Sequence, residues 1–131
     1  MLAKQIIEKY PLSKEVMKDW FLQKMISSFN DNNIDGPFKE YMIKMGVDDI
    51  QVEKVINGSP RMLLDLFDVN DIYISIIHTI YGFKYIINGN ESKFFEDRFL
   101  TEKEAILKGI IILEDKLKQS EEKIDNKDLE L

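Results

Sequence analysis

Residues 68–90 decide the fold class, because the sequence pattern changes here from helical to extended. The stretch reads DVNDIYISIIHTIYGFKYIINGN. Ile72–Ile80 and Phe83–Ile87 are rich in isoleucine and tyrosine, which favour β-strands. Asn88-Gly89-Asn90 follows them and is a strong turn signal for a β-hairpin. We therefore expect an antiparallel sheet formed by these two runs and by a returning strand at Lys93–Phe99.

The sequence before this stretch predicts a cluster of helices. Apolar residues from Leu2 to Ile7 predict a short helix that ends before Pro11, because proline disfavours helical geometry in the preceding residue. Ser13 is a suitable N-cap for a second helix, which carries apolar side chains over most of its circumference as far as Phe29. A helix with this pattern is expected to lie centrally in the molecule.

Three shorter helices are expected next. The Asn-, Asp- and Gly-rich segment 30–36 ends the second helix. Helices are then predicted at Pro37–Met45 and at Asp49–Asn57, each followed by a glycine that can end it. Ser59-Pro60 supplies a cap and a first helical residue, and the apolar pattern continues through Phe67.

A final helix is expected after the strands. Thr101-Glu102-Lys103-Glu104 has the form of a capping box, so we predict a helix from about Glu102 to Leu117. Gly109 lies on its main apolar stripe and would allow the helix to approach the sheet closely. Beyond Lys118 the chain is rich in Lys, Glu and Asp, and we expect a frayed acidic tail at 119–131.

These elements together predict an α+β fold, in which an N-terminal helical cluster is followed by a three-stranded antiparallel sheet and a closing C-terminal helix. We expect a single domain over 1–118, with a helical half at 1–67 and a sheet-plus-helix half at 71–118. The chain has 131 residues, of which 44% are hydrophobic. This is too apolar for a disordered chain, yet no apolar run approaches the ~18 residues of a membrane span.

Leu107 and Ile111 are the candidate interaction residues. They lie on the final helix opposite its main apolar stripe, and a two-layer arrangement of sheet and helix would leave this i, i+4 pair exposed. Either the N-terminal helices cover the pair, or another chain does. We favour the internal arrangement, because a domain usually has one contiguous core.

The charge distribution argues against nucleic acid as a partner. The net charge is −6, and windows 1–30, 31–71, 72–113 and 114–131 carry +2, −5, 0 and −3. A nucleic-acid-binding surface usually gathers Lys and Arg, because neutralising phosphates supplies much of the affinity. The charge favours a protein partner.

Two segments resemble known motifs in part. Asp31–Gly36 is similar to the start of an EF-hand calcium loop, but its twelfth position is Met42 where the loop needs a Glu, so we interpret it as an interhelical turn. Residues 38–57 fit the spacing of a helix-turn-helix. The helix that would read DNA carries Asp48, Asp49 and Glu53, so we expect two packed helices without a DNA role.

The order helix, strand, strand, strand, helix from about Ile50 to Leu117 resembles the double-stranded-RNA-binding domain. Thr101–Ala105, followed by Gly109 and Leu113, is similar to the closing-helix motif of that family. In place of its lysines this chain has Glu102, Lys103, Glu104 and Lys108, so the resemblance implies the topology rather than RNA binding. The stretch from Phe99 to Glu114 also resembles a strand-and-helix element of small proteins from phages and their bacterial hosts, which implies no activity.

The residues suited to catalysis are few. His78 is the only histidine and lies in a predicted strand, so we expect a structural role for it. Asp65, Asp68 and Asp71 lie where a helix ends and could approach a metal, but a solvated helix end is the usual case. Glycine-rich phosphate loops, serine elbows and HExxH are missing from the sequence. We predict that the protein is not an enzyme and has no cofactor or metal.

The chain has no cysteine, which fits a reducing compartment, and we expect a cytoplasmic location without membrane association. We predict a phage-type accessory protein that acts by binding another protein, with a second copy of itself among the candidate partners. The alternative is a nucleic-acid-binding regulator that uses residues 38–57 or the half that resembles the RNA-binding domain.

Overall fold

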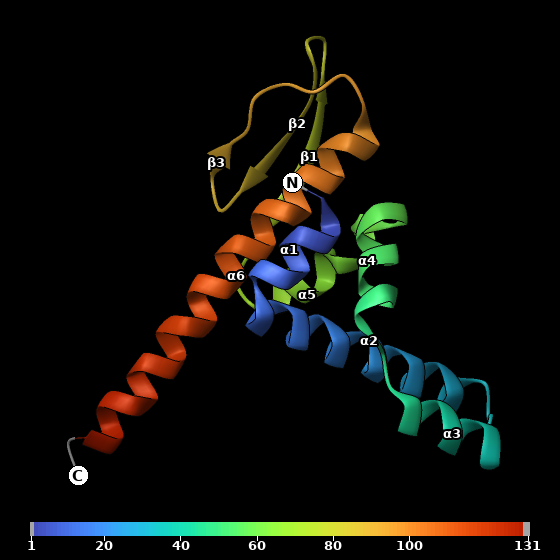
Figure 1. The fold of residues 1–131 in the computed structure, drawn as a ribbon. Coiled ribbons are helices and arrows are strands. Elements are labelled where there is room, and N and C mark those ends of the chain that lie inside the picture. Colours follow the sequence, from blue (N-terminus) through green and yellow to red (C-terminus); the bar gives the residue numbers. More distant parts are fainter. Residues whose placement is uncertain (1, 130–131) are drawn as a thin grey trace.

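The structure is a computed structural model that describes the backbone of residues 2–129 and the side chains of residues 2–122. The helices and strands follow in the order α1 (Ala3–Lys9), α2 (Pro11–Asp31), α3 (Pro37–Met45), α4 (Asp49–Gly58), the 3₁₀ helix η1 (Pro60–Leu63), α5 (Leu64–Val69), β1 (Ile74–Thr79), β2 (Gly82–Ile87), β3 (Asn90–Glu91) and α6 (Arg98–Leu129). The predicted α+β fold, with N-terminal helices, an antiparallel sheet of three strands and a long C-terminal helix, is confirmed (Figure 1).

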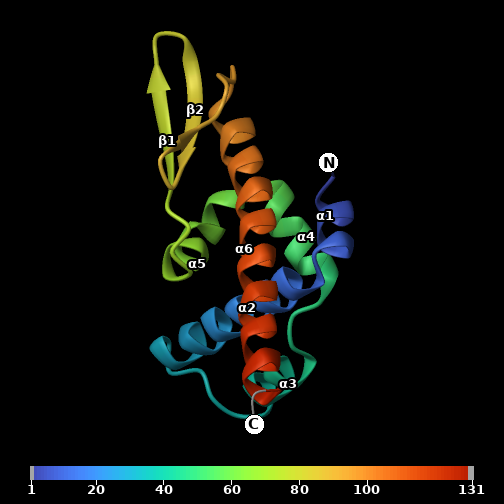
Figure 2. The ribbon, with the colours of Figure 1, turned by 90° about the vertical axis from the view of Figure 1, so that its left-hand side faces the viewer.

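Helix α6 is the axis on which the other elements pack. The β1–β2 hairpin lies beside the N-terminal half of α6, and α1 and α4 lie on the other side of that half (Figure 2). Helix α2 crosses α6 near its middle. One buried apolar cluster joins these elements, and its largest fully buried side chains include Met17, Ile56, Phe67, Ile72 and Ile110.

Gly109 allows α6 to lie close to the sheet, as the sequence predicts. A Cβ atom at this position would lie 3.2 Å from Ile74 Cδ1 of β1 and 3.2 Å from Phe67 Cε1 of α5. A larger residue would push α6 away from both neighbours, since packed interiors leave no space for an added methyl group.

The strands are joined by two tight turns. Asn88 and Gly89 link β2 to β3 with φ values of 48° and 86°, as a type I′ hairpin turn requires, which confirms the predicted turn. Ile80 and Tyr81 form the tip between β1 and β2, where Thr79 pairs with Gly82. Gly82 has φ 122°, and a Cβ atom there would lie 2.5 Å from Phe95 O.

The predicted third strand at Lys93–Phe99 is wrong, because these residues are irregular up to Asp97 and helical from Arg98. The third strand of the sheet, β3, lies directly after the Asn88-Gly89 turn instead. It covers only Asn90–Glu91, and the backbone N–H of Tyr85 donates to the hydroxyl of Ser92 instead of to a carbonyl oxygen (2.9 Å). Because the Ser92 side chain occupies this ladder position, the strand pairing is interrupted. It resumes only at an isolated bridge between Phe83 and Phe95.

The N-terminus of α6 also differs from the prediction. The helix begins at Arg98, because Asp97 rather than Thr101 is the N-cap: the Leu100 N–H donates to Asp97 Oδ1 (2.8 Å). Thr101 is fully buried, and its hydroxyl donates to the Asp97 carbonyl (2.7 Å). The capping-box interpretation was therefore wrong, and Phe99 is helical rather than extended.

The C-terminus of α6 lies well beyond the predicted end at Leu117. The helix has 32 residues and runs to Leu129, so the expected frayed tail at 119–131 is helical over its described part. The physical reason is that Lys, Glu and Gln are good helix formers and need no apolar anchor to continue a helix. Residues 130–131 lie outside the described residues.

Ser13 is not the N-cap of α2, because Pro11 already occupies the first helical position. The cap comes from a distant residue: the fully buried carboxylate of Glu114 accepts the N–H groups of Leu12 (3.2 Å) and Ser13 (2.7 Å). The Ser13 hydroxyl donates to the Ile110 carbonyl (3.2 Å). These three hydrogen bonds tie the start of α2 to the middle of α6.

Candidate functional site

A helical arm with an uncovered apolar surface is the main candidate site. We define the arm as residues 18–45, which form the C-terminal part of α2, the connecting turn and α3. Met17 and Val52 are fully buried, but no side chain between them is buried. The half-buried apolar residues of α2 in this arm are Trp20, Phe21, Leu22, Met25, Ile26 and Phe29.

Helix α3 carries the most exposed part of this surface. Phe38, Tyr41 and Met45 are 61%, 59% and 65% exposed. Their i, i+3, i+7 spacing places them on one face of α3, and we name them the α3 stripe. An aromatic side chain has about 150–250 Å² of surface, so the stripe exposes roughly 300 Å² of apolar area. The largest apolar patch on a monomeric protein is typically about 300–600 Å² and is often functional.

The arm is attached to the rest of the molecule only at its base. Figure 1 shows α3 and the end of α2 projecting away from the sheet, on the opposite side from the C-terminal half of α6. Helix α3 packs mainly on α2, where the rings of Phe29 and Phe38 meet edge to face with 6.0 Å between their centroids. It therefore has no fully buried residue of its own.

The two interaction candidates from the sequence do not form a common surface. Leu107 is only 5% exposed and belongs to the core, so it is covered from within the chain. Ile111 is partly exposed and is not part of that core. The α3 stripe was not predicted, although the sequence shows the apolar spacing over 38–45. Periodicity indicates that one face of a helix is apolar, but it does not reveal whether other elements cover that face.

The helix-turn-helix interpretation is not supported by the packing of its helices. We expected α3 and α4 to pack on each other. Instead α3 packs mainly on α2, whereas α4 packs on α1, α2 and η1. Helix α4 buries Val52 and Ile56 in the core, and Asp49 at its start forms ion pairs with Lys14 (3.5 Å) and Lys18 (3.1 Å) of α2.

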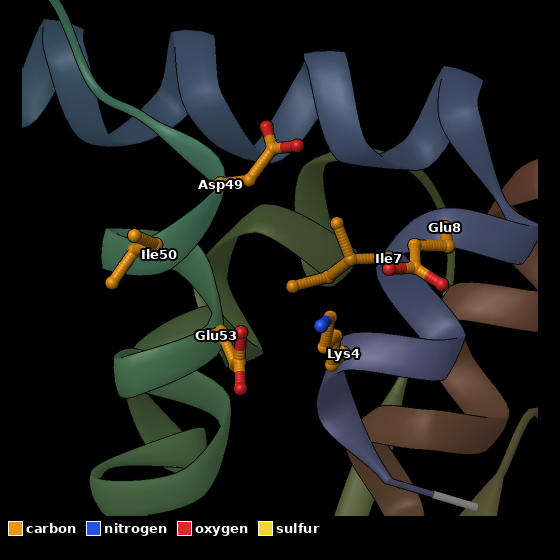
Figure 3. Close-up of a pocket in the computed structure, with 6 residues that line it drawn as sticks. All are labelled: Lys4, Ile7, Glu8, Asp49, Ile50 and Glu53. Carbon is orange, nitrogen blue, oxygen red and sulfur yellow. The ribbon is translucent and has the colours of Figure 1, made fainter.

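A small pocket lies between α1 and α4. It has a volume of about 140 Å³ and is lined by Lys4, Ile7, Glu8, Asp49, Ile50 and Glu53, so three carboxylates surround an apolar centre (Figure 3). The hydrogen bond from Lys18 lowers the pKa of Asp49 and raises the pKa of Lys18. A lowered pKa does not suit a general acid, which needs a raised one.

In the segment Asp31–Gly36, which resembles the start of a calcium loop, the polar groups form hydrogen bonds within the turn or with residues next to it. Asp35 Oδ1 accepts the N–H of Gly36 (2.9 Å), and Asn32 Nδ2 donates to the Ser28 carbonyl (2.8 Å). Asn30 Oδ1 accepts a hydrogen bond from the Lys39 ammonium (2.6 Å). The segment is thus an ordered interhelical turn.

The remaining polar candidates lie apart from one another. Among the described side chains, no group of three or more Asp, Glu, His or Cys residues is placed to hold a metal ion. Asp71 accepts a hydrogen bond from the Tyr73 hydroxyl (3.0 Å), which raises the pKa of Tyr73. His78 is exposed on β1 and stacks on Phe83, with 4.1 Å between the ring centroids.

No protein-family model, curated protein or solved structure matches the chain. Within the part of the chain that the structure describes, no helix is long and apolar enough to cross a membrane.

Proposed function

We propose that the protein is a non-enzymatic, cytoplasmic accessory protein of phage type that acts by binding another protein chain through its α2–α3 arm. The observation that carries this proposal is the arm itself, because none of its residues, 18–45, has a buried side chain.

The energetics of α3 support the proposal. Ordering a residue costs about 1–2 kcal/mol of backbone conformational entropy, and an isolated helix shorter than ~12–15 residues is marginal in water. Helix α3 has nine residues and buries none of them fully. A partner that covers the α3 stripe would supply the missing apolar burial, at about 25 cal/mol for each Å² removed from water.

A second copy of this chain is the first partner to test as the one that covers the α3 stripe. Two amphipathic helical hairpins that present the same apolar face can join about a twofold axis as a four-helix bundle. Charged residues of both signs lie in or next to α3, namely Asp35, Lys39, Glu40 and Lys44. A twofold arrangement can pair these charges between copies.

The proposal is tested with the double variant Phe38→Glu/Tyr41→Glu. We expect sedimentation velocity to show an associated wild type and a monomeric variant with unchanged far-ultraviolet circular dichroism. The matched control is Met62→Glu, which places a charge at a 57% exposed apolar residue outside the arm and should leave association unchanged.

If the wild type is monomeric, a second copy of this chain is excluded as the partner, and another protein is tested instead. In that case the wild type and the double variant are compared by chemical crosslinking in the native cell. A crosslinked partner that is lost with the double variant but kept with Met62→Glu supports the proposal. Identical crosslinks for all three proteins would refute it.

Nucleic-acid binding is the competing function, and the charge at the start of α4 argues against it. Asp48, the N-cap of α4, and Asp49, its first residue, are both exposed and would repel phosphates. We expect no salt-dependent mobility shift with random duplex DNA or RNA. A shift that weakens steeply with ionic strength would favour the regulator instead.

A further inference from the structure

A second pocket lies at the opposite end of α4 from the arm. It is bordered by the end of α4, the start of η1 and the first turns of α6, which lie side by side near the base of the hairpin (Figure 1). Its volume is about 380 Å³, and it is lined by Gly58, Ser59, Pro60, Arg61, Arg98, Phe99 and Glu102. It is a hollow open to solvent, on which the side chains of Arg61, Arg98 and Phe99 are exposed.

Both arginines of the chain line this pocket. The sequence contains only Arg61 and Arg98, and the fold brings them together from separate elements. The ion pairs of residues 2–122 are formed by lysines, and neither arginine lies within 4.0 Å of a carboxylate oxygen of these residues. Glu102 contributes to the same pocket without pairing with either guanidinium group.

The chemistry of the lining defines the class of ligand. A guanidinium group is planar and donates two parallel hydrogen bonds to a phosphate or carboxylate group. Phe99 is 44% exposed, so part of its ring remains available for stacking with a planar ligand. The charges of Arg61, Arg98 and Glu102 together favour a single oxyanion over a polyphosphate, because Glu102 would repel further negative charge.

We propose that this pocket binds a small molecule in which one oxyanion group, a phosphate or a carboxylate, is attached to a planar aromatic ring. The two arginines hold the oxyanion, and Phe99 stacks on the ring. The pocket does not include any residue of the α2–α3 arm, so the proposal is independent of the protein-binding function.

The test uses four probes and heteronuclear NMR titration of the full chain. Phenyl phosphate and benzoate carry the complete chemistry, inorganic phosphate lacks the ring, and benzamide lacks the charge. We expect phenyl phosphate or benzoate to bind about tenfold more tightly than either incomplete probe, with shifts centred on residues 58–61 and 98–102. The tighter of the two complete probes identifies the oxyanion.

Variants assign the binding to the two arginines. Arg61→Gln and Arg98→Gln should each weaken the tighter probe about tenfold, and Phe99→Ala should weaken it while leaving inorganic phosphate unaffected. Lys54→Gln removes one positive charge from the exposed surface of α4 outside the pocket and should change the affinity less than twofold. Absence of binding at millimolar concentrations of phenyl phosphate and benzoate, or an equal loss with Lys54→Gln, would overturn the proposal.

Discussion

At the scale of single residues, the buried carboxylate of Glu114 replaces a local helix cap. A helix begins with N–H groups that have no partner inside the helix, and a side chain near in sequence usually satisfies them. In this protein α6 supplies the acceptor, and the positive end of the α2 dipole stabilises its negative charge. One residue thus satisfies two N–H groups and fixes the crossing of two helices.

The substitution Glu114→Gln should destabilise the protein by about 1–3 kcal/mol, because the amide NH₂ group would face one of the two N–H groups and leave it without an acceptor. Urea denaturation measures the loss in the free energy of unfolding. Glu121→Gln is the matched control, because Glu121 lies exposed on the same helix. Equal effects of the two substitutions would contradict the capping role.

Gly82 shows a second constraint at this scale. Its φ of 122° is unfavourable for other residues, and a Cβ atom would collide with the Phe95 carbonyl. We expect Gly82→Ala to lower the melting temperature, at a cost of about 1–3 kcal/mol for the strained backbone alone. Gly58→Ala is the control, since its Cβ atom would have nothing within 4 Å. A Gly82→Ala protein as stable as this control would refute the argument.

At the scale of elements, α3 and α6 differ in how they are stabilised. The N-terminal half of α6 packs against the sheet on one side and α1 and α4 on the other, whereas α3 is supported mainly by α2. Local unfolding costs least where few apolar contacts are buried. The arm is therefore the part of the helical half that should open most readily.

Hydrogen–deuterium exchange tests this difference. In the Phe38→Glu/Tyr41→Glu protein, we expect the amides of α3 to exchange at least tenfold faster than those of residues 105–114 in α6, most of which are buried. In the associated wild type the α3 amides should become protected. Slow exchange of α3 in the monomeric variant would show that the arm is stable without a partner.

At the scale of the whole molecule, the fold class could be predicted because the residue pattern changes sharply at Asp68–Asp71 and Asn88-Gly89 forms the turn that its chemistry favours. The ends of α6 could not be predicted as reliably. Asp97 and Thr101 are both suitable caps, and only the burial of Thr101 by tertiary packing decides between them.

The candidate sites could not be predicted, because local sequence patterns do not show which residues the fold leaves exposed or brings together. Periodicity identifies Phe38, Tyr41 and Met45 as apolar, but whether other elements cover them is a property of the complete fold. In the same way, nothing in the sequences around Arg61 and Arg98 indicates that they share a pocket. Long-range convergence of this kind follows only from the three-dimensional arrangement.

The uninterrupted course of α6 has a practical consequence. A helix rises about 1.5 Å per residue, so its 32 residues extend over almost 50 Å, from the two-arginine pocket at its first turn to its far end. Reporter groups or affinity handles attached near that end would therefore lie far from the pocket that Arg61 and Arg98 line.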